Sequence, residues 1–201
     1  MYQDLKSYQN AIMIHDFTVE FVKRYIDPKS RTTDQMAQAA RSGKQNIAEG
    51  AANSRQKPKS ETMLLGVASA SLKELLEDYK DYLRQHQLQI WSLNDMRALR
   101  IRNLYKTNPT YTTDQTYQSY QTYLSSPESA CNAMICLISQ TTYLLDNQIK
   151  GVEKQQKGTG LVFESREQRA ARALMQGRMR EAEIDAIIKE AMKSWSDSWN
   201  I

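Results

Sequence analysis

Runs of apolar residues at alternating spacings of three and four constrain this chain more than any other feature of its sequence. The clearest run begins near the N-terminus and contains Leu5, Tyr8, Ile12, His15, Val19, Val22 and Ile26. Such spacing gathers the side chains into one seam along an α-helix, and the seam is buried when the helix packs against others. We therefore predict a helix over residues 4–27, which ends at Asp27-Pro28 because a residue before proline disfavours helical geometry.

Three later segments repeat this pattern. Residues 33–55 carry Met36, Ala40, Gly43, Ile47, Gly50 and Ser54; residues 60–86 carry Leu65, Ala68, Leu72, Leu75, Tyr79, Tyr82 and His86; and residues 127–157 carry Met134, Ile138, Thr141, Leu145, Gln148 and Val152. Four long helices with such seams are typical of a bundle around one core. The predicted fold class is therefore all-α, with an up-and-down four-helix bundle over residues 1–160. Glu61 is expected to favour the start of the third helix from its first turn.

The periodicity weakens between the third and fourth helices and again after residue 160. We predict a partly helical insertion over residues 87–125, with one short helix from about Ser92 to Lys106 that uses Leu93, Met96, Leu99 and Leu104. Further along, Tyr117, Tyr120 and Leu124 share one helical face. Residues 161–201 are predicted to form an additional C-terminal helical suffix that docks onto the bundle or onto a neighbouring subunit.

The second helix contains two glycines on its seam, Gly43 and Gly50. A glycine inside a helix costs about 1 kcal/mol relative to alanine, so two of them indicate a compensating packing role. A missing side chain is useful where another backbone approaches closely. We therefore expect both glycines to lie where two helices come closest.

Few residues in this chain suggest catalysis or metal binding. Neither histidine belongs to the Glu-x-x-His motif of di-metal bundles, because apolar residues stand three positions before His15 and His86. We interpret both histidines as core or interface residues. Cys131 and Cys136 point about 140° apart on one helix and are interpreted as reduced core thiols. We expect no enzymatic activity, no catalytic residue, no metal and no cofactor.

The sequence also bears on location. It starts Met-Tyr-Gln-Asp-Leu-Lys, without a charged leader followed by an apolar run, and its longest uncharged stretch, residues 129–145, contains Ser, Asn, Gln and Thr. These features predict a cytoplasmic protein that does not enter the membrane.

The charge of the chain is concentrated in one segment. Residues 28–60 contain seven basic and two acidic residues, a net charge of +5, whereas the whole chain carries +4. A local basic surface is typical of proteins that contact polyanions such as RNA or DNA. The candidate nucleic-acid-binding residues are Arg41, Lys44, Arg55, Lys57 and Lys59. Arg41 and Lys44 are three apart and therefore share a helix face.

Two polar residues within the second helix allow two interpretations. Asn46 and Glu49 could form a structural polar core, a buried hydrogen-bond network that sets the register between helices. Alternatively, Glu49 could hold a basic residue that points at a ligand.

Several sequence blocks resemble a known family. These are Tyr2-Gln-Asp-Leu-Lys6 with Tyr8-Gln9, Asn46-Ile-Ala-Glu-Gly50 with Gln35-Met36, Ala39-Ala40 and Ser42 before it, Ser60-Glu61, and Gly66-Val-Ala-Ser-Ala-Ser-Leu72 with Glu74-Leu75. Together they resemble the bacterial four-helix-bundle proteins encoded within intervening sequences of the large-subunit ribosomal RNA. That family includes the accessory variability determinant of diversity-generating retroelements. The likeness covers residues 2–85, and the C-terminal suffix resembles one found in a subset of the family.

The resemblance implies an antiparallel four-helix bundle that assembles as a homo-oligomer, with a ring-like pentamer known among its members. It also implies a positively charged surface, which in the retroelement relative binds nucleic acid and a protein partner. This chain departs from the family pattern at Ala37 and Gln38, where two adjacent arginines are usual, and at Gly43-Lys44, where Ile-Pro is usual.

Two functions from different classes follow. The first is a non-catalytic oligomeric binding protein that contacts RNA or DNA through the basic face of the second helix and the following loop. The second is a structural or protein–protein interaction module without a nucleic-acid role. Its contact residues would then be aromatic, since aromatic side chains are enriched at interfaces: Tyr111, Tyr117, Tyr120, Tyr123, Trp195 and Trp199.

Overall fold

The computed structural model describes residues 2–53, 58–107 and 119–157, and the regular secondary structure of these residues is entirely helical. The all-α prediction is thus confirmed for this part of the chain. The helices are η1 (Tyr2–Asp4), α1 (Lys6–Tyr25), α2 (Arg31–Asn53), α3 (Pro58–Gln85), α4 (Met96–Thr107), η2 (Thr122–Ser125) and α6 (Pro127–Lys157). The chain divides into units Met1–Leu161 and Val162–Ile201, and all described residues belong to the first. The predicted suffix, residues 161–201, lies outside them.

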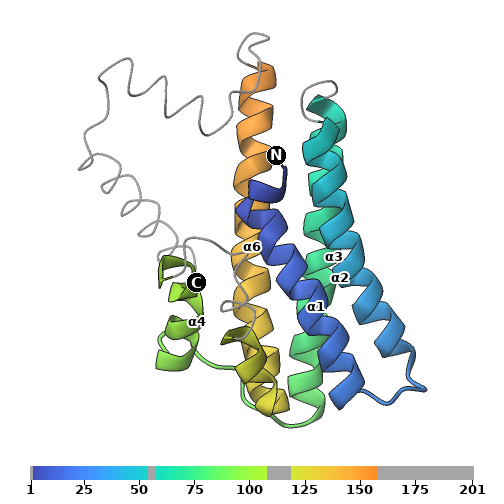
Figure 1. Ribbon diagram of the computed structural model, residues 1–201, viewed down its shortest axis with the longest axis vertical. Coiled ribbons are helices and arrows are strands. Elements are labelled where there is room, and N and C mark those ends of the chain that lie inside the picture. Colours follow the sequence, from blue (N-terminus) through green and yellow to red (C-terminus); the bar gives the residue numbers. More distant parts are fainter. Residues whose placement is uncertain (1, 54–57, 108–118, 158–201) are drawn as a thin grey trace. The chain divides into compact units, whose positions relative to one another are not determined.

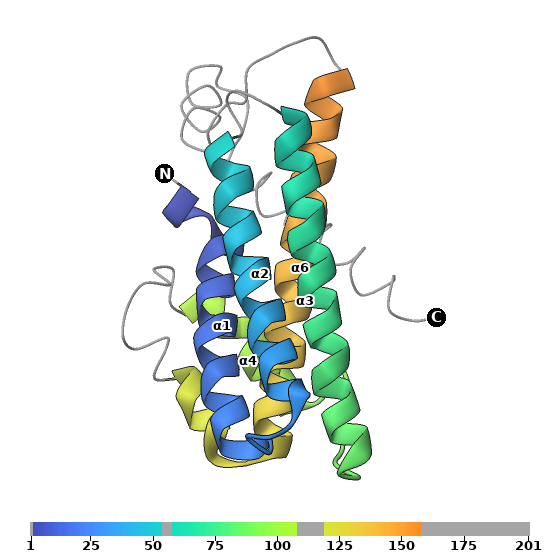
Figure 2. The same cartoon turned by 90° about the vertical axis from the view of Figure 1, so that its right-hand side faces the viewer.

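Four long helices, α1, α2, α3 and α6, lie side by side around one apolar core (Figures 1 and 2). Both α1 and α3 pack against α2 and against α6. The shorter helices α4 and η2 pack on α6, so they add to the outside of this arrangement. The core therefore depends on contributions from all four long helices, as the seams predicted.

Three of the four predicted seams are buried. On α2 the buried positions include Met36, Ala40, Gly43, Ile47 and Gly50, and on α3 every seam residue from Leu65 to Tyr82 is buried. On α6 the seam is buried except for half-buried Gln148. The exception at the end of the α3 seam is exposed His86, whose ring stacks on Tyr82 with 4.0 Å between centroids.

The predicted seam of α1 is wrong except at Val22, which is buried. Ile12 is 36% exposed and His15 is half-buried, whereas the buried side of the helix carries Ser7, Asn10, Ala11, Met13, Ile14, Phe17, Thr18, Phe21 and Val22. The core side of α1 is therefore turned by about one residue, or roughly 100°, from the expected one. Its polar members hid the pattern, because Ser7, Asn10 and Thr18 do not read as core residues.

Hydrogen bonds explain why Ser7 and Thr18 are tolerated inside. Thr18 Oγ1 donates to the Ile14 carbonyl at 2.7 Å and lies 3.0 Å from the Tyr79 hydroxyl. Ser7 Oγ donates to Gln148 Oε1 at 3.1 Å. Buried polar groups cost little when they are paired in this way. Phe21, which contacts the rings of both Tyr79 and Tyr82, supplies the apolar area that the polar positions lack.

The insertion contains the expected short helix, but its packing face differs from the prediction. Ala98 and Ile101 are buried, whereas Leu93 is 45% and Met96 is 66% exposed. Tyr120 and Leu124 are buried, each 2% exposed. Tyr117 lies outside the described residues.

Both seam glycines of α2 pack against α3. A Cβ atom placed on Gly43 would lie 2.7 Å from Leu72 Cδ2 and 2.8 Å from Leu72 Cγ. A Cβ on Gly50 would lie 3.4 Å from Leu64 Cβ and 3.5 Å from the Glu61 carbonyl oxygen, which are ordinary contacts. Both glycines therefore face α3, and the tighter of the two contacts is the one between Gly43 and the Leu72 side chain.

Alanine substitution should separate this packing role from helix propensity. Gly43→Ala should destabilise the fold by about 1–2 kcal/mol, because the new methyl group displaces the fully buried Leu72 and this outweighs the gain in propensity. Gly66→Ala is the matched control, since nothing lies within 4 Å of its added Cβ. That variant should gain about 1 kcal/mol. Urea denaturation measures both, and a Gly43→Ala protein more stable than the parent would contradict the close approach.

Candidate functional site

The basic residues predicted on α2 do not form one continuous surface. Arg41 is exposed and lies between exposed Gln38 and Gln45, one turn away on either side. No carboxylate contact is recorded for Arg41 among the described residues. Its guanidinium is therefore available to an anionic ligand, and the nearest acidic residue on the same helix face is exposed Asp34, two turns away.

Lys44 is directed towards α1 instead. Its Nζ lies 3.3 Å from His15 Nδ1, which in turn lies 3.0 Å from Asp16 Oδ1. One ring nitrogen cannot accept from Lys44 and donate to Asp16 at once, so the two contacts require different protonation states of His15. Lys44 is half-buried and links two helices, which makes it a weaker candidate for ligand contact than Arg41.

The predicted polar core is found only in part. Asn46 Nδ2 donates to the Ser42 carbonyl at 2.9 Å and to Ser42 Oγ at 3.2 Å, and Ser42 Oγ lies 3.0 Å from Ser71 Oγ on α3. This chain of contacts links α2 to α3 beside Gly43. Glu49 is exposed, so its inclusion in a buried network was wrong. The reason is rotational, because Glu49 lies on the same side of the Ile47–Gly50 seam as Asn46 but about 60° farther from it.

The other predicted cationic residues cannot be placed. Arg55 and Lys57 lie outside the described residues, and Lys59 belongs to the first turn of α3 but its side chain is not described. Their part in a binding surface stays a prediction.

A second basic element was missed by the sequence reasoning. Helix α4 contains four basic residues, Arg97, Arg100, Arg102 and Lys106, and no acidic one. Arg100 is exposed, whereas Arg97 pairs with Asp95 Oδ2 at 2.7 Å, and this partner raises the pKa of Arg97. The signal was present in the sequence, since a charge count over twelve residues would have found it.

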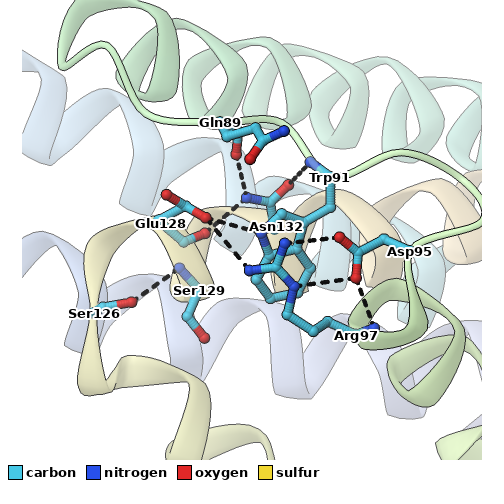
Figure 3. Close-up of polar contacts among 8 residues, drawn as sticks. All are labelled: Gln89, Trp91, Asp95, Arg97, Ser126, Glu128, Ser129 and Asn132. Atoms are coloured by element: carbon cyan, nitrogen blue, oxygen red, sulfur yellow. Dashed lines mark hydrogen bonds and ion pairs between the residues drawn. The ribbon is translucent and has the colours of Figure 1, made fainter.

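A polar clasp holds the segment before α4 onto the start of α6 (Figure 3). Asn132 Oδ1 accepts from the Trp91 backbone N–H at 2.8 Å, and Asn132 Nδ2 donates to the Gln89 carbonyl at 2.8 Å. Trp91 Nε1 donates to Glu128 Oε1 at 3.0 Å, and the Arg97 guanidinium lies 4.2 Å from the centre of the Trp91 ring. The clasp fixes an irregular segment with side-chain hydrogen bonds where helical ones are missing.

Removing the central amide should loosen the clasp. Asn132→Ala leaves the Trp91 N–H and the Gln89 carbonyl without their partner, and Asn132 is only 2% exposed. We expect a loss of about 2–4 kcal/mol in the free energy of unfolding. Asn46→Ala is the control, because its bonds are local and half-exposed, and it should cost about 1 kcal/mol or less. Equal losses in urea denaturation would contradict a special role for Asn132.

Glu61 is an unexpected carboxyl group in the core. It stands four residues before Leu65, so it continues the α3 seam, and it is 2% exposed. No hydrogen bond or ion pair of its side chain is recorded among the described residues. Burial raises the pKa of this carboxyl to about 7. Sequence reasoning considered only its position in the first helical turn, although its spacing from Leu65 would have placed it on the seam.

The raised pKa predicts stability that falls as the pH rises. Below about pH 4 the carboxyl is protonated in both the folded and the unfolded chain, so its ionisation does not lower the free energy of unfolding. Between about pH 4 and pH 7 only the unfolded chain releases the proton. The penalty should reach about 1–3 kcal/mol above pH 7, reduced by the favourable helix N-terminus. Glu61→Gln should therefore match the parent at pH 4 and exceed its stability at pH 8. The same substitution at exposed Glu49 should show no such divergence. If the stability of the parent and of Glu61→Gln varied with pH in parallel, the raised pKa of Glu61 would be contradicted.

The two thiols are poor nucleophiles. Cys131 is buried and Cys136 half-buried, and both are unpaired. Burial raises the pKa of Cys131 strongly and that of Cys136 to about 11, so both stay protonated near neutral pH.

Residues 2–53, 58–107 and 119–157 contain no group of three or more His, Cys, Asp or Glu side chains placed to hold a metal ion. Within the same residues, no helix combines the length and the apolar character needed to span a membrane.

Comparisons with known proteins add no relative. No family model matches the chain, and searches of curated proteins and of solved structures return no match. The resemblance to the intervening-sequence proteins therefore rests on the residues quoted above.

Proposed function

We propose that this chain forms an antiparallel, up-and-down four-helix bundle that acts as a non-catalytic, homo-oligomeric binding protein for RNA or DNA. Nucleic acid would contact the exposed face of α2 and the basic connection that follows it. The family resemblance supports this assignment, and it implies assembly into a ring such as a pentamer.

The observation that carries the proposal is the setting of Arg41. The exposed guanidinium has no carboxylate contact within residues 2–53, 58–107 and 119–157, and together with two flanking exposed glutamine side chains it offers hydrogen-bond donors to an approaching phosphate. The segment from residue 28 to residue 60 contributes a net charge of +5 around it. A single protomer would bind weakly with so few cations. In an oligomer the copies would act together through their high effective concentration.

Interaction with another protein remains the alternative function. The tyrosines that would support it are used internally where they are described, since Tyr120 is 2% exposed and Tyr123 is half-buried. Tyr111, Tyr117, Trp195 and Trp199 lie outside the described residues. The aromatic residues therefore favour this alternative less than their number in the sequence suggested.

A salt titration with a charge-matched control tests the proposal. In the test variant Arg41, Lys44, Arg55, Lys57 and Lys59 are changed to glutamine; in the control five cations of α3 and α6, Lys73, Lys80, Arg84, Lys150 and Lys154, are changed. Both variants lose the same net charge. Affinity for single- and double-stranded oligonucleotides is measured across a salt series, with thermal melting as the check on folding.

The parent should bind without sequence preference, with an affinity that falls steeply with salt. The test variant should bind at least about tenfold more weakly at low salt. Its plot of log affinity against log salt concentration should also be shallower, by about one unit of slope for each phosphate that the variant no longer neutralises. The control should keep the parental slope. A parent that binds no nucleic acid at low salt would overturn the proposal in favour of the protein-interaction function, and equal slopes for the two variants would place the phosphate-binding residues elsewhere.

A further inference from the structure

Exposed apolar side chains gather at two places on the described surface. Met63 and Val67 on α3 are 64% and 43% exposed, and Ile90, Leu93 and Met96 before and at the start of α4 are 49%, 45% and 66% exposed. These five are most of the large apolar side chains that are exposed in the described residues. Such groupings mark contact surfaces more often than scattered single residues do.

The first surface is a stripe along α3, formed by Met63, Val67, Ala70 and Glu74. All four are exposed, and their spacings of four, three and four residues place them on one helix face over a length of about 16 Å. No ion pair of Glu74 is recorded among the described residues, whereas Glu77 and Asp81 pair with Lys80 and Arg84. The stripe is therefore apolar at one end and carries an uncompensated negative charge at the other.

The second surface is the entry to α4, formed by Ile90, Leu93, Met96 and Arg100. The polar clasp holds it in place, and the Asp95 backbone N–H donates to the Ser92 carbonyl at 3.0 Å to close the turn that carries Leu93. Arg97 satisfies both nearby carboxylates, Asp95 and Glu128. Arg100 is exposed, and no carboxylate contact is recorded for it in the described part of the chain. This surface is apolar with an uncompensated positive charge.

We propose that the α3 stripe of one protomer docks onto the α4 entry surface of a second copy of this chain. The two surfaces match in kind, since each presents exposed apolar side chains beside one unpaired charge, and the charges are opposite. The stripe lies in the first two thirds of α3, whereas the entry surface follows the end of α3 in the chain, so the two belong to different parts of the protomer. Nucleic acid is a poorer occupant, because unbranched and branched aliphatic side chains offer neither phosphate donors nor stacking surfaces.

A contact between two different surfaces is heterologous and leaves each pair with one free surface of each kind. Assembly therefore continues until a ring closes or a filament grows. This inference rests on the oligomeric part of the proposed function and is independent of its nucleic-acid part. The small number of side chains involved predicts an association that depends on concentration.

The test is sedimentation velocity of the full chain over a range of about 5–300 µM without nucleic acid, concentrations that span the affinities of weak interfaces. Met63→Ser removes the stripe and Met96→Ser removes the entry surface, and the two methionines are almost equally exposed. Each variant alone should associate at least about tenfold more weakly than the parent. Mixed in equal amounts, the two variants retain one complete contact and should form 1:1 pairs without larger species.

The charges provide a second arm. Glu74→Arg and Arg100→Glu should each weaken association. The chain that carries both changes should recover it, because each contact then again joins a positive and a negative side chain, with the signs exchanged. Ile12→Ser is the control, since Ile12 is exposed on α1 away from both surfaces and its change should have no effect.

Three outcomes would overturn the inference. The parent could be monomeric at every concentration, or Ile12→Ser could weaken self-association as much as Met63→Ser does. The third outcome is a mixture of the two methionine variants that forms no pairs. None of these bears on the salt titration of nucleic-acid binding. The two proposals can therefore fail separately.

Discussion

The approach of α2 to α3 at Gly43 is the interaction on which the rest of this structure depends. The glycine leaves room for Leu72, whose side chain is fully buried, and the Ser42–Ser71 contact lies beside it. The larger side chains of α1 and α6 complete the core around this contact. A methyl group at this point would move Leu72 and with it the packing of its neighbours, since protein interiors accommodate added volume poorly.

The core of this protein is more polar than its heptad pattern suggests. Thr18 and Tyr79 share a hydrogen bond at its centre, whereas the buried Asn10 Oδ1 has no hydrogen-bond partner among the described residues. Glu61 adds a carboxyl group at the start of α3. Paired groups of this kind set the register between helices, and unpaired ones lower the stability of the fold. The same arrangement can therefore be well defined in geometry and modest in stability.

The surface divides into parts with different chemistry. Arg41 is exposed on α2 between two glutamines. Helix α4 carries four cations, of which Arg97 is paired with Asp95, and α3 carries the stripe from Met63 to Glu74. Burial raises the pKa of both thiols, and the recorded contacts of the two histidines are with Asp16, Lys44 and the Tyr82 carbonyl. The binding function that we propose draws on the exposed charges and apolar side chains.

The sequence by itself determined the helices, because periodicity and proline positions are local properties. The bounds of the four long helices agree with the predicted ones to within two residues, and the seams of α2 and α3 and the role of Gly43 were predicted correctly. Of the candidate site, the exposure of Arg41 and the link through Asn46 could be anticipated from helix geometry. The burial of Glu61 and the exposure of Glu49 follow from their spacing relative to the α3 and α2 seams. Only the tertiary structure decided which side of α1 is buried and that Lys44 turns to His15. Each of these depends on how one helix is rotated against its neighbours. A rotation of about 100° exchanges core and surface while leaving the spacing pattern almost unchanged.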